Sequence, residues 1–173
     1  MTGDIVTAYI GLGSNLESPR GDRSRHLELA AKALSGIGEV TNMSSVYETT
    51  PWDVTDRQPD YLNAVAALST AMDPSALVTT MLGIETDLGR ERSEKNGSRV
   101  IDLDVLLFGN NVINQTGVQI PHPRLHERAF VLVPLAEINT TGVHPIFGIT
   151  ISELLSTVDI SGVRRYGDAP SSR

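Results

Sequence analysis

The chain has 173 residues, of which 40% are hydrophobic and 20% charged, a composition typical of one globular domain that can bury a core. It contains no cysteine, which excludes disulfides, thiolate catalysis and zinc–thiolate sites. The net charge of −7 argues against a sequence-independent nucleic-acid binder. There is no apolar run of about 18 residues and no signal-peptide pattern, so we expect a cytoplasmic protein without a membrane span.

The first half of the chain predicts two strand–helix–strand units. Runs rich in β-branched and apolar residues predict strands over residues 5–10, 39–47 and 61–70. Apolar residues at helical spacing predict a helix over residues 24–36. A second helix is expected to begin with Asp73 as its N-cap and to end near Gly89.

Residues 11–15, G-L-G-S-N, have the look of a phosphate-binding loop. However, the Walker lysine and the third glycine of the dinucleotide-binding fingerprint are both missing. We therefore interpret this segment as a tight turn by which the chain leaves its first strand.

A polar loop over residues 48–60 carries two prolines and the only tryptophan of the chain, Trp52. Loops of this length in compact domains are commonly functional lids or disordered segments, and the tryptophan favours a lid. In the strand that follows, Tyr61, Asn63 and Val65 share one face. The polar Asn63 is either a satisfied core amide or a recognition group, and the sequence leaves both interpretations open.

The strongest functional signal is the run K-N-G-S-R-V-I-D-L-D-V-L at residues 95–106. It predicts a strand over residues 100–108, in which side chains alternate between the two faces, so Asp102 and Asp104 share one face roughly 6–7 Å apart. Two carboxylates this close repel each other unless a cation lies between them, and Mg²⁺ prefers such oxygen ligands. The sequence therefore predicts a magnesium site on this strand.

Simpler interpretations of this region remain. An Asp-x-Asp pair can be the solvated face of an edge strand, and a charged loop can be merely hydrated. Here the run is apolar enough for a central strand, where paired acids are costly without a partner. The cations of the adjoining loop are Arg90, Arg92, Lys95 and Arg99. We favour a site for phosphoryl chemistry on a small polyanionic ligand.

The elements predicted after this strand are a hairpin turn at 109–111 leading to 112–113, an irregular proline segment at 120–124, and helices over 128–138 and 152–157. We expect one domain over residues 1–165, followed by a disordered tail over residues 166–173. His122 and His126 have a spacing that can hold zinc, but H-P-R-L-H lacks the glutamate of the zinc motif H-E-x-x-H. His122 is better explained as a group beside a phosphate or as a structural histidine.

Separated blocks of the chain, taken in order, resemble the 6-hydroxymethyl-7,8-dihydropterin pyrophosphokinases of folate biosynthesis. The resemblance runs from residue 9 to about residue 160. The blocks are Y-I-G-L-G-S-N-L at 9–16, Y-E-T at 47–49 with Pro51, Q-P-D-Y-L-N-A at 58–64, Glu85 with Gly89-Arg90, K-x-G-S-R-x-x-D-L-D-V-L at 95–106, and P-H-P-R-L-H-E-R-A-F at 121–130.

This resemblance implies an α+β, ferredoxin-like fold with a mainly antiparallel sheet and helices on both faces. It implies a monomer, acting on small molecules rather than on nucleic acid or membranes, that transfers pyrophosphate from ATP to the hydroxymethyl group of the pterin and gives AMP. Asp102 and Asp104 match residues that hold two Mg²⁺ ions, while Arg90 and Arg99 match arginines that engage the phosphates. The other matched residues are Glu85, Arg92, Lys95, His122 and Arg128 on the ATP side, and Thr49, Trp52, Tyr61, Asn63 and Phe130 on the pterin side.

Three departures from the enteric-bacterial members affect the loops. The basic loop is one residue shorter and carries Asn96 in place of a tryptophan, Pro123 replaces a tyrosine, and the loop at residues 48–60 is one residue longer. Two rival functions are a non-catalytic ferredoxin-like ligand-binding domain and a metal-dependent phosphohydrolase. The presence of both arginines with both aspartates argues against the first, because binding alone would not require that set.

Overall fold

The computed structural model of the protein describes residues 3–91 and 97–173. Its strands are β1 (Val6–Ser14), β2 (Glu39–Met43), β3 (Val46–Thr49), β4 (Tyr61–Thr70), β5 (Asp102–Phe108), β6 (Ile113–Gln115), β7 (Val118–Ile120) and β8 (Val163–Gly167). Its helices are α1 (Arg23–Leu34), α2 (Pro74–Asp87), α3 (Ala129–Ile138) and α4 (Ile151–Leu155), with a 3₁₀ turn, η1 (Leu125–Glu127).

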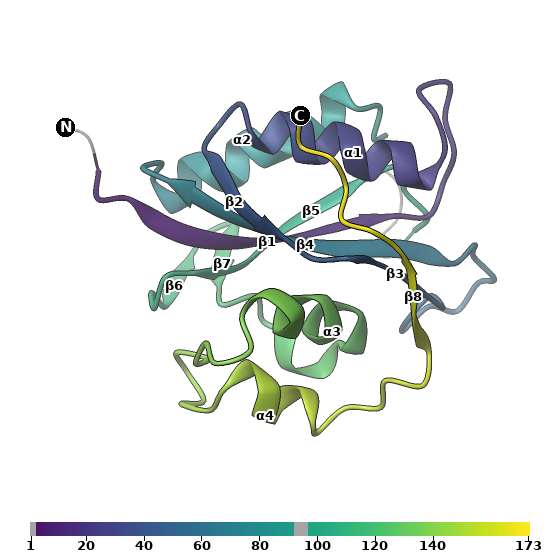
Figure 1. The fold of residues 1–173 in the computed structure, drawn as a ribbon. Helices are drawn as coiled ribbons and strands as arrows, with labels where there is room; N and C mark the ends of the chain where they lie inside the picture. The colour runs from purple at the N-terminus through teal and green to yellow at the C-terminus, as the bar shows by residue number, and fades with distance from the viewer. Residues whose placement is uncertain (1–2, 92–96) are drawn as a thin grey trace.

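A six-stranded sheet of order β5-β1-β4-β3-β8, with β2 also paired to β4, forms the centre of the molecule. All of these pairings are antiparallel. Helices α1 and α2 cover one face of the sheet, and α3 and α4 lie on the other (Figure 1). The predicted α+β architecture, with a mainly antiparallel sheet and helices on both faces, is confirmed.

The central strand β4 has the bounds that the sequence predicted. Residues 62–68 are all buried, because strands pair along both edges of β4 and a core cluster covers each face of the sheet. Such a strand reads as a continuous apolar run, which makes it the easiest kind to find in a sequence. Its first residues, Tyr61 and Asn63, lie beside the end of β1, where Gly13 is paired with Asn63.

Strand β5 lies on the other side of β1, at the edge of the sheet, so the prediction of a central strand for this run is wrong. In this pairing Gly11 is opposite Asp104 and Gly13 is opposite Asp102. The two aspartates are half-buried and alternate with the buried residues Leu103 and Val105, as the period of a strand requires. The predicted placement of both carboxylates on one face is confirmed.

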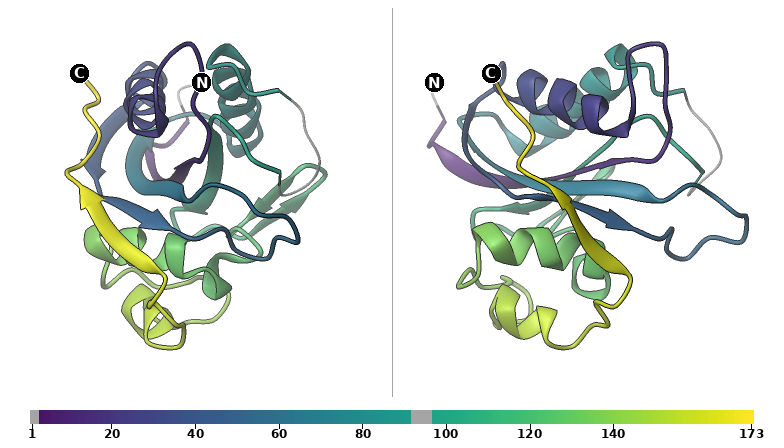
Figure 2. Two further views of the ribbon diagram at one scale, coloured as in Figure 1. Left: turned by 90° about the vertical axis from the view of Figure 1, so that its right-hand side faces the viewer. Right: turned by 45° about the vertical axis from the view of Figure 1, so that its right-hand side comes forward.

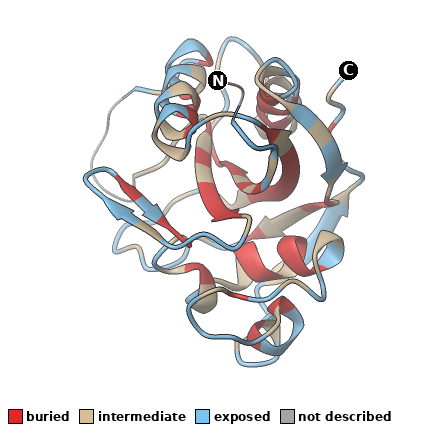
Figure 3. Ribbon diagram, turned by 90° about the vertical axis from the view of Figure 1, so that its left-hand side faces the viewer, coloured by how far each residue is buried: buried red, intermediate tan, exposed pale blue. Residues whose placement is uncertain are grey.

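The layer formed by α1 and α2 begins at two aspartate caps. Asp22 accepts a hydrogen bond from the backbone N–H of Arg25, and Asp73 accepts from those of Ser75 and Ala76. The predicted Asp73 cap is therefore confirmed, and such caps stabilise a helix by about 1 kcal/mol each. The apolar sides of both helices pack on the sheet in the larger of two core clusters (Figure 3).

The opposite layer has its own apolar core. Its members include Val65 of β4, Leu106 of β5, Leu132 and Leu135 of α3, and Ile151 of α4. Two views of the ribbon show α3 between the sheet and α4 (Figure 2). Among the described residues, we find no helix long and apolar enough to cross a membrane.

The predicted turn at residues 11–15 is wrong. Strand β1 continues through Ser14, and Gly11 and Gly13 are paired with β4 on one side and β5 on the other. A Cβ atom on Gly13 would lie 3.2 Å from Oδ1 of Asn63, a tight contact. Gly13 therefore lies where the Asn63 side chain leaves little room for a Cβ atom. The sequence alone does not distinguish this requirement from a turn.

The predicted strand over residues 39–47 is two strands, β2 and β3. Between them the backbone N–H of Ser44 donates to the carbonyl of Val65, and the Ser44 hydroxyl accepts from the Val65 N–H. The N–H of Ser45 donates to the carboxylate of Glu137 on α3. These bonds replace the regular ladder and break the strand at this point.

The predicted hairpin from residues 109–111 to 112–113 is also wrong. The segment after the turn forms β6, which pairs with β7 and not with β5. On β5, the Leu106 carbonyl instead accepts a hydrogen bond from the N–H of His122, which follows β7. At the C-terminus, β8 takes in residues 166 and 167, which were expected to belong to the tail, and it pairs with β3. Further along the tail, the carbonyl of Ser172 accepts a hydrogen bond from the Ser35 hydroxyl.

Candidate active site

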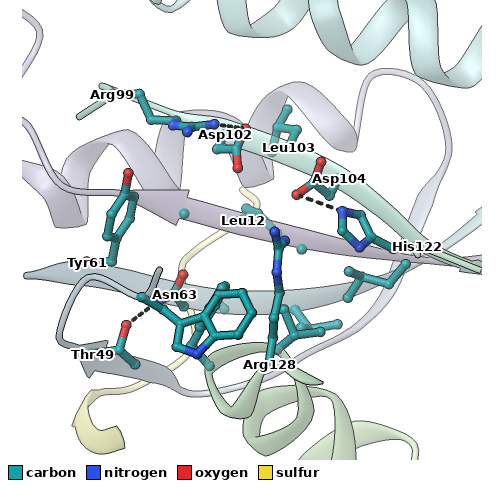
Figure 4. Close-up of a pocket in the computed structure, with 18 of the residues that line it drawn as sticks. Leu12, Thr49, Tyr61, Asn63, Arg99, Asp102, Leu103, Asp104, His122 and Arg128 are labelled. Carbon is teal, nitrogen blue, oxygen red and sulfur yellow. Dashed lines mark hydrogen bonds and ion pairs between the residues drawn. The ribbon is translucent and has the colours of Figure 1, made fainter. Parts of the chain in front are cut away.

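A cavity of about 350 Å³ lies where the C-terminal end of β1 meets the beginnings of β4 and β5. Side chains from the loop after β3 and from the segment between β7 and α3 form its other wall (Figure 4). The predicted site residues that line it are Thr49, Trp52, Tyr61, Asn63, Glu85, Arg90, Arg99, Asp102, Asp104, His122, Arg128 and Phe130. Arg92, Lys95 and Asn96 lie outside the described residues.

Two arginines converge on Asp102. The Nη1 atoms of Arg90 and Arg99 lie 2.9 and 3.0 Å from the same carboxylate oxygen, Oδ1. Arg90 is held in turn by Glu85, whose Oε2 lies 2.6 Å from Nη1 of Arg90. Hydrogen bonds with ionised partners are short and strong, so this cluster fixes two guanidinium groups at the edge of the cavity.

Among the described residues, Asp104 has fewer close charged partners than Asp102. Burial raises its pKa to about 7, and the nearby Asp102 carboxylate adds to the shift. Its Oδ2 lies 3.9 Å from Nε2 of His122. Burial, with the neighbouring Arg128, lowers the pKa of His122 to about 4, so the imidazole is neutral at neutral pH. Its Nδ1 accepts from the backbone N–H of Arg124, so the ring proton is on Nε2, which faces Asp104.

The aspartate pair fits a hard divalent cation. No group of three or more acidic, histidine or cysteine side chains suited to a metal occurs in the part of the chain that the structure describes. Two carboxylates are nevertheless enough for Mg²⁺, which keeps several waters and shares substrate phosphates. The raised pKa of Asp104 shows that negative charge is poorly compensated there, and a bound cation would relieve this.

Polar and aromatic groups form the wall opposite the aspartates. Asn63 donates from Nδ2 to the Thr49 hydroxyl at 2.8 Å, which leaves Oδ1 as an acceptor beside Gly13. The Asn63 amide is therefore hydrogen-bonded, as one of the two alternatives expected, and because the residue also lines the cavity, its role as a recognition group stays a prediction. The Tyr61 hydroxyl donates to the carbonyl of Gly97 at 3.4 Å, and burial raises the pKa of this phenol.

Trp52 packs against the segment that enters α3. Its ring meets Phe130 edge-on, with centroids 6.2 Å apart. The guanidinium of Arg124 lies 4.2 Å from the centre of the Trp52 ring, and its Nη1 is 2.9 Å from Oδ2 of Asp53. His126 does not share in this arrangement, because its ring packs against Phe147.

Sequence reasoning missed several contributors. Gly13 admits the Asn63 amide, Arg124 and Asp53 join the two loops, and Asn15 contacts both flanking segments. Arg124 and Asn15 belong to quoted blocks of the chain, but only spatial neighbours reveal what they contact. Charge spacing could not have found the Arg124–Asp53 pair, because its members are 71 residues apart.

Comparison with known proteins identifies the chain's relatives. The family model of the 7,8-dihydro-6-hydroxymethylpterin-pyrophosphokinases matches residues 9–140. The chain is 43% identical over 164 residues to a 2-amino-4-hydroxy-6-hydroxymethyldihydropteridine pyrophosphokinase of Methylorubrum extorquens, covering 93% of this chain and 99% of that protein. It is 42% identical over 143 residues to the enzyme of the same name from Haemophilus influenzae, with coverage of 82% and 86%.

The fold also matches solved structures. The crystal structure of Plasmodium falciparum HPPK-DHPS with pteroate superimposes with a TM-score of 0.73 at 15% identity. The match covers 91% of this chain but 43% of that one, so our chain spans less than half of that protein. At this identity the likeness supports the fold alone.

Proposed function

Because the chain belongs to the 7,8-dihydro-6-hydroxymethylpterin-pyrophosphokinase family, we propose that the cavity beside β5 is where it carries out the reaction of that family. The protein transfers pyrophosphate from ATP to the hydroxymethyl group of 6-hydroxymethyl-7,8-dihydropterin in folate biosynthesis. The pterin oxygen loses its proton and bonds to the β-phosphorus. The bond from that phosphorus to the oxygen shared with the α-phosphate breaks, and AMP leaves.

One observation carries the proposed site. A cluster of two arginines and two aspartates faces the same cavity as a wall of aromatic rings and an amide. Phosphoryl transfer needs positioning and charge neutralisation more than covalent help from the protein. A flat, nitrogen-rich ring is well held by aromatic faces and by groups that can donate and accept. The cavity therefore offers what each of the two substrates requires.

On the phosphate side, we assign Arg90 and Arg99 to the transferring group. Both are already fixed against Asp102, so little reorganisation is needed when charge develops. Asp102 and Asp104 would hold Mg²⁺, with two ions expected. When bound, Mg²⁺ neutralises phosphate charge and draws electron density from the reacting oxygens. The remaining ATP contacts are assigned to His122 and Arg128 and, from the sequence match, to Arg92 and Lys95, whereas Glu85, which was matched to the ATP side, supports Arg90.

On the pterin side, we assign Tyr61 and Phe130 to the ring faces. Asn63 and Thr49 supply hydrogen-bonding groups at the ring edge, and their mutual bond sets which amide atom faces the cavity. Trp52 lines the cavity, and the Arg124 guanidinium packs over its ring.

Glu85 acts mainly by fixing Arg90 and the β5 backbone, because its two oxygens are taken up by Arg90 and by the Leu103 N–H.

We also assign one domain and a monomeric, cytoplasmic state to the protein. The single domain is supported by a continuous sheet with a core cluster on each face, which leaves no division of the described chain into separate parts. The monomeric and cytoplasmic state rests on the family resemblance. Light scattering on the purified protein would report its molar mass directly. A mass of twice 18.6 kDa would contradict the monomer.

The deciding experiment follows the fate of both substrates. Purified protein, Mg²⁺, ATP and the pterin are mixed, and the products are separated by anion exchange. We expect AMP and pterin diphosphate in equal amounts. Formation of ADP and phosphate with unchanged pterin would point to a phosphohydrolase, and tight binding without turnover would point to a binding domain. Either result would overturn the proposal.

A further inference from the structure

Asn15 is a buried polar residue with no role in the chemistry described so far. It follows the last residue of β1 and is 2% exposed. It is not among the described residues that line the cavity. A buried amide is costly unless its groups are hydrogen-bonded, so its partners show what it holds in place.

One set of partners belongs to the segment that carries Arg99. The backbone N–H of Arg99 donates to Oδ1 of Asn15 at 2.8 Å, and the N–H of Asn15 donates back to the Arg99 carbonyl at 3.1 Å. Nδ2 of Asn15 also lies 3.3 Å from the Ser98 hydroxyl. These bonds fix the backbone of Arg99 to the end of β1, three residues before Asp102.

The second set of partners belongs to the segment that leads into Tyr61. Nδ2 of Asn15 donates to the carbonyl of Pro59 at 3.1 Å and lies 3.4 Å from Oε1 of Gln58. The amide orientation is determined by these groups, because the Arg99 N–H can only donate and the Pro59 carbonyl can only accept. One side chain thus joins segments 44 and 84 residues away in the sequence.

We infer that Asn15 is a positioning residue for the transfer. Its amide holds the segment of Arg99, which faces the phosphates, against the segment of Tyr61, which faces the ring. The distance between the walls that face the two substrates would therefore depend in part on this amide. The inference rests on the proposed function, since it assigns the phosphates to Arg99 and the pterin to Tyr61.

A purely structural amide is the competing explanation. Against it, within the part of the chain that the structure describes, the hydrogen-bond partners of the Asn15 side chain all lie in the two segments that lead to Arg99 and to Tyr61. A further bond, from the Tyr61 hydroxyl to the Gly97 carbonyl, joins the same two segments nearby. The contacts are therefore concentrated where the two substrates must meet.

The test compares Asn15→Ala and Asn15→Asp with a matched control, Thr70→Val. Thr70 is also a buried hydrogen-bonding residue, but it lies at the far end of β4, where its hydroxyl donates to the Ile37 carbonyl. The aspartate variant keeps the acceptor for the Arg99 N–H and loses the donor to Pro59. It also serves as the second variant if Asn15→Ala does not fold.

Two quantities are measured for each variant. The first is the exchange rate of the Arg99 amide proton in the free protein, which should rise in Asn15→Ala and stay near wild type in Asn15→Asp. The second is kcat at saturating substrates, which should fall about 10²-fold in both variants, the scale expected for a misplacement near 1 Å. Affinity for ATP alone should change little, because Asn15 does not face the nucleotide.

Several outcomes would overturn the inference. Asn15 is merely structural if its variants lose only unfolding free energy, as Thr70→Val should, and keep the wild-type kcat. Unchanged exchange of the Arg99 amide in Asn15→Ala would show that Asn15 does not hold that segment. Failure of the proposed function would be recognised differently, because the wild-type protein itself would then form no AMP. The exchange rate of the Arg99 amide would still decide whether Asn15 holds the Arg99 segment.

Discussion

Glu85 illustrates how one buried carboxylate can organise a cluster of charges. It is 3% exposed, which would be costly for a lone carboxylate. Its Oε1 accepts from the Leu103 N–H at 2.6 Å, and its Oε2 pairs with Arg90 at the same distance. The carboxylate therefore ties helix α2 to strand β5 and aims Arg90 at Asp102. The order of the site depends on a residue that does not itself need to touch a substrate.

At the residue scale, we expect Asp102→Asn and Asp104→Asn each to abolish Mg²⁺-dependent formation of AMP while the fold is kept. The substitution preserves size but removes the charge that a hard cation requires. Turnover is measured across a Mg²⁺ titration, with circular dichroism to verify folding. Asp87→Asn, at the exposed end of α2, is the control and should behave as wild type. Normal activity in either site variant would contradict the metal assignment.

The arginines give a second prediction at this scale. If Arg99 stabilises charge on the transferring group, Arg99→Ala should lower kcat by about 10²–10³-fold, the usual loss for one preorganised electrostatic contact. Arg99→Lys should recover little, because lysine cannot reproduce the planar fork. Steady-state kinetics separates an effect on kcat from an effect on KM, and Arg25→Lys, a substitution at an exposed ion pair, is the control. An increase in KM with an unchanged kcat would mean that Arg99 only binds ATP.

At the scale of elements, the sequence predicted correctly those features whose pattern lies within one continuous segment of the chain. The alternation of β5 placed both aspartates on one face, and the apolar run of β4 predicted its bounds, because both signals lie within a single strand. The break between β2 and β3 depends on Glu137, 92 residues beyond Ser45, and no local pattern could reveal it. Asn15 was missed for the same reason, as its partners come from two distant segments.

The loop that carries Trp52 gives the prediction for an element. We expect it to close further over the pterin, since the ring is 39% exposed and lies beside the cavity. With a non-hydrolysable ATP analogue and Mg²⁺ present, adding the pterin should reduce the access of acrylamide to Trp52. Trp52 is the only tryptophan, so its fluorescence needs no label. Accessibility is a better measure than intensity, because pterins absorb and quench.

A variant of Arg124 provides the matched comparison. Arg124→Met keeps much of the side-chain length but removes the ion pair with Asp53 and the cation over the Trp52 ring. Quencher access in the ligand-free protein should therefore rise in this variant. If saturating ligands leave access unchanged in the wild-type protein, the segment is static and the idea of a closing lid must be dropped.

At the scale of the whole molecule, Glu48 joins three parts of the chain. Its carboxylate lies 3.0 Å from Arg23 of α1 and 3.0 Å from Arg164 of β8, and Arg164 also reaches Asp60. The C-terminal strand β8, at the edge of the sheet, is thus bound to β3 by side chains as well as by the backbone ladder. Glu48 and Asp60 lie at the two ends of the loop that carries Trp52, so the strength of this network bears on the site as well as on the fold.

The Glu48 network should make stability depend on pH in a defined direction. Burial by itself would raise the pKa of Glu48, but hydrogen bonds from Arg164 and Arg23 outweigh it, and the folded-state pKa is lowered. A group whose pKa is lowered on folding stabilises the protein above its unfolded pKa, and this contribution is lost as the pH falls through the folded pKa.

In urea titrations, Glu48→Gln should therefore lower the unfolding free energy by about 1–2 kcal/mol at pH 7. The difference from wild type should shrink as the pH falls below the usual glutamate pKa and the carboxylate of the folded protein takes up a proton. Glu28→Gln, which breaks the exposed pair with Arg25, is the matched control and should have little effect at any of these pH values, because exposed ion pairs contribute little. A Glu48→Gln difference that stays constant between pH 7 and pH 3 would mean that the glutamate acts through packing and that its charge does not fasten β8 to the sheet.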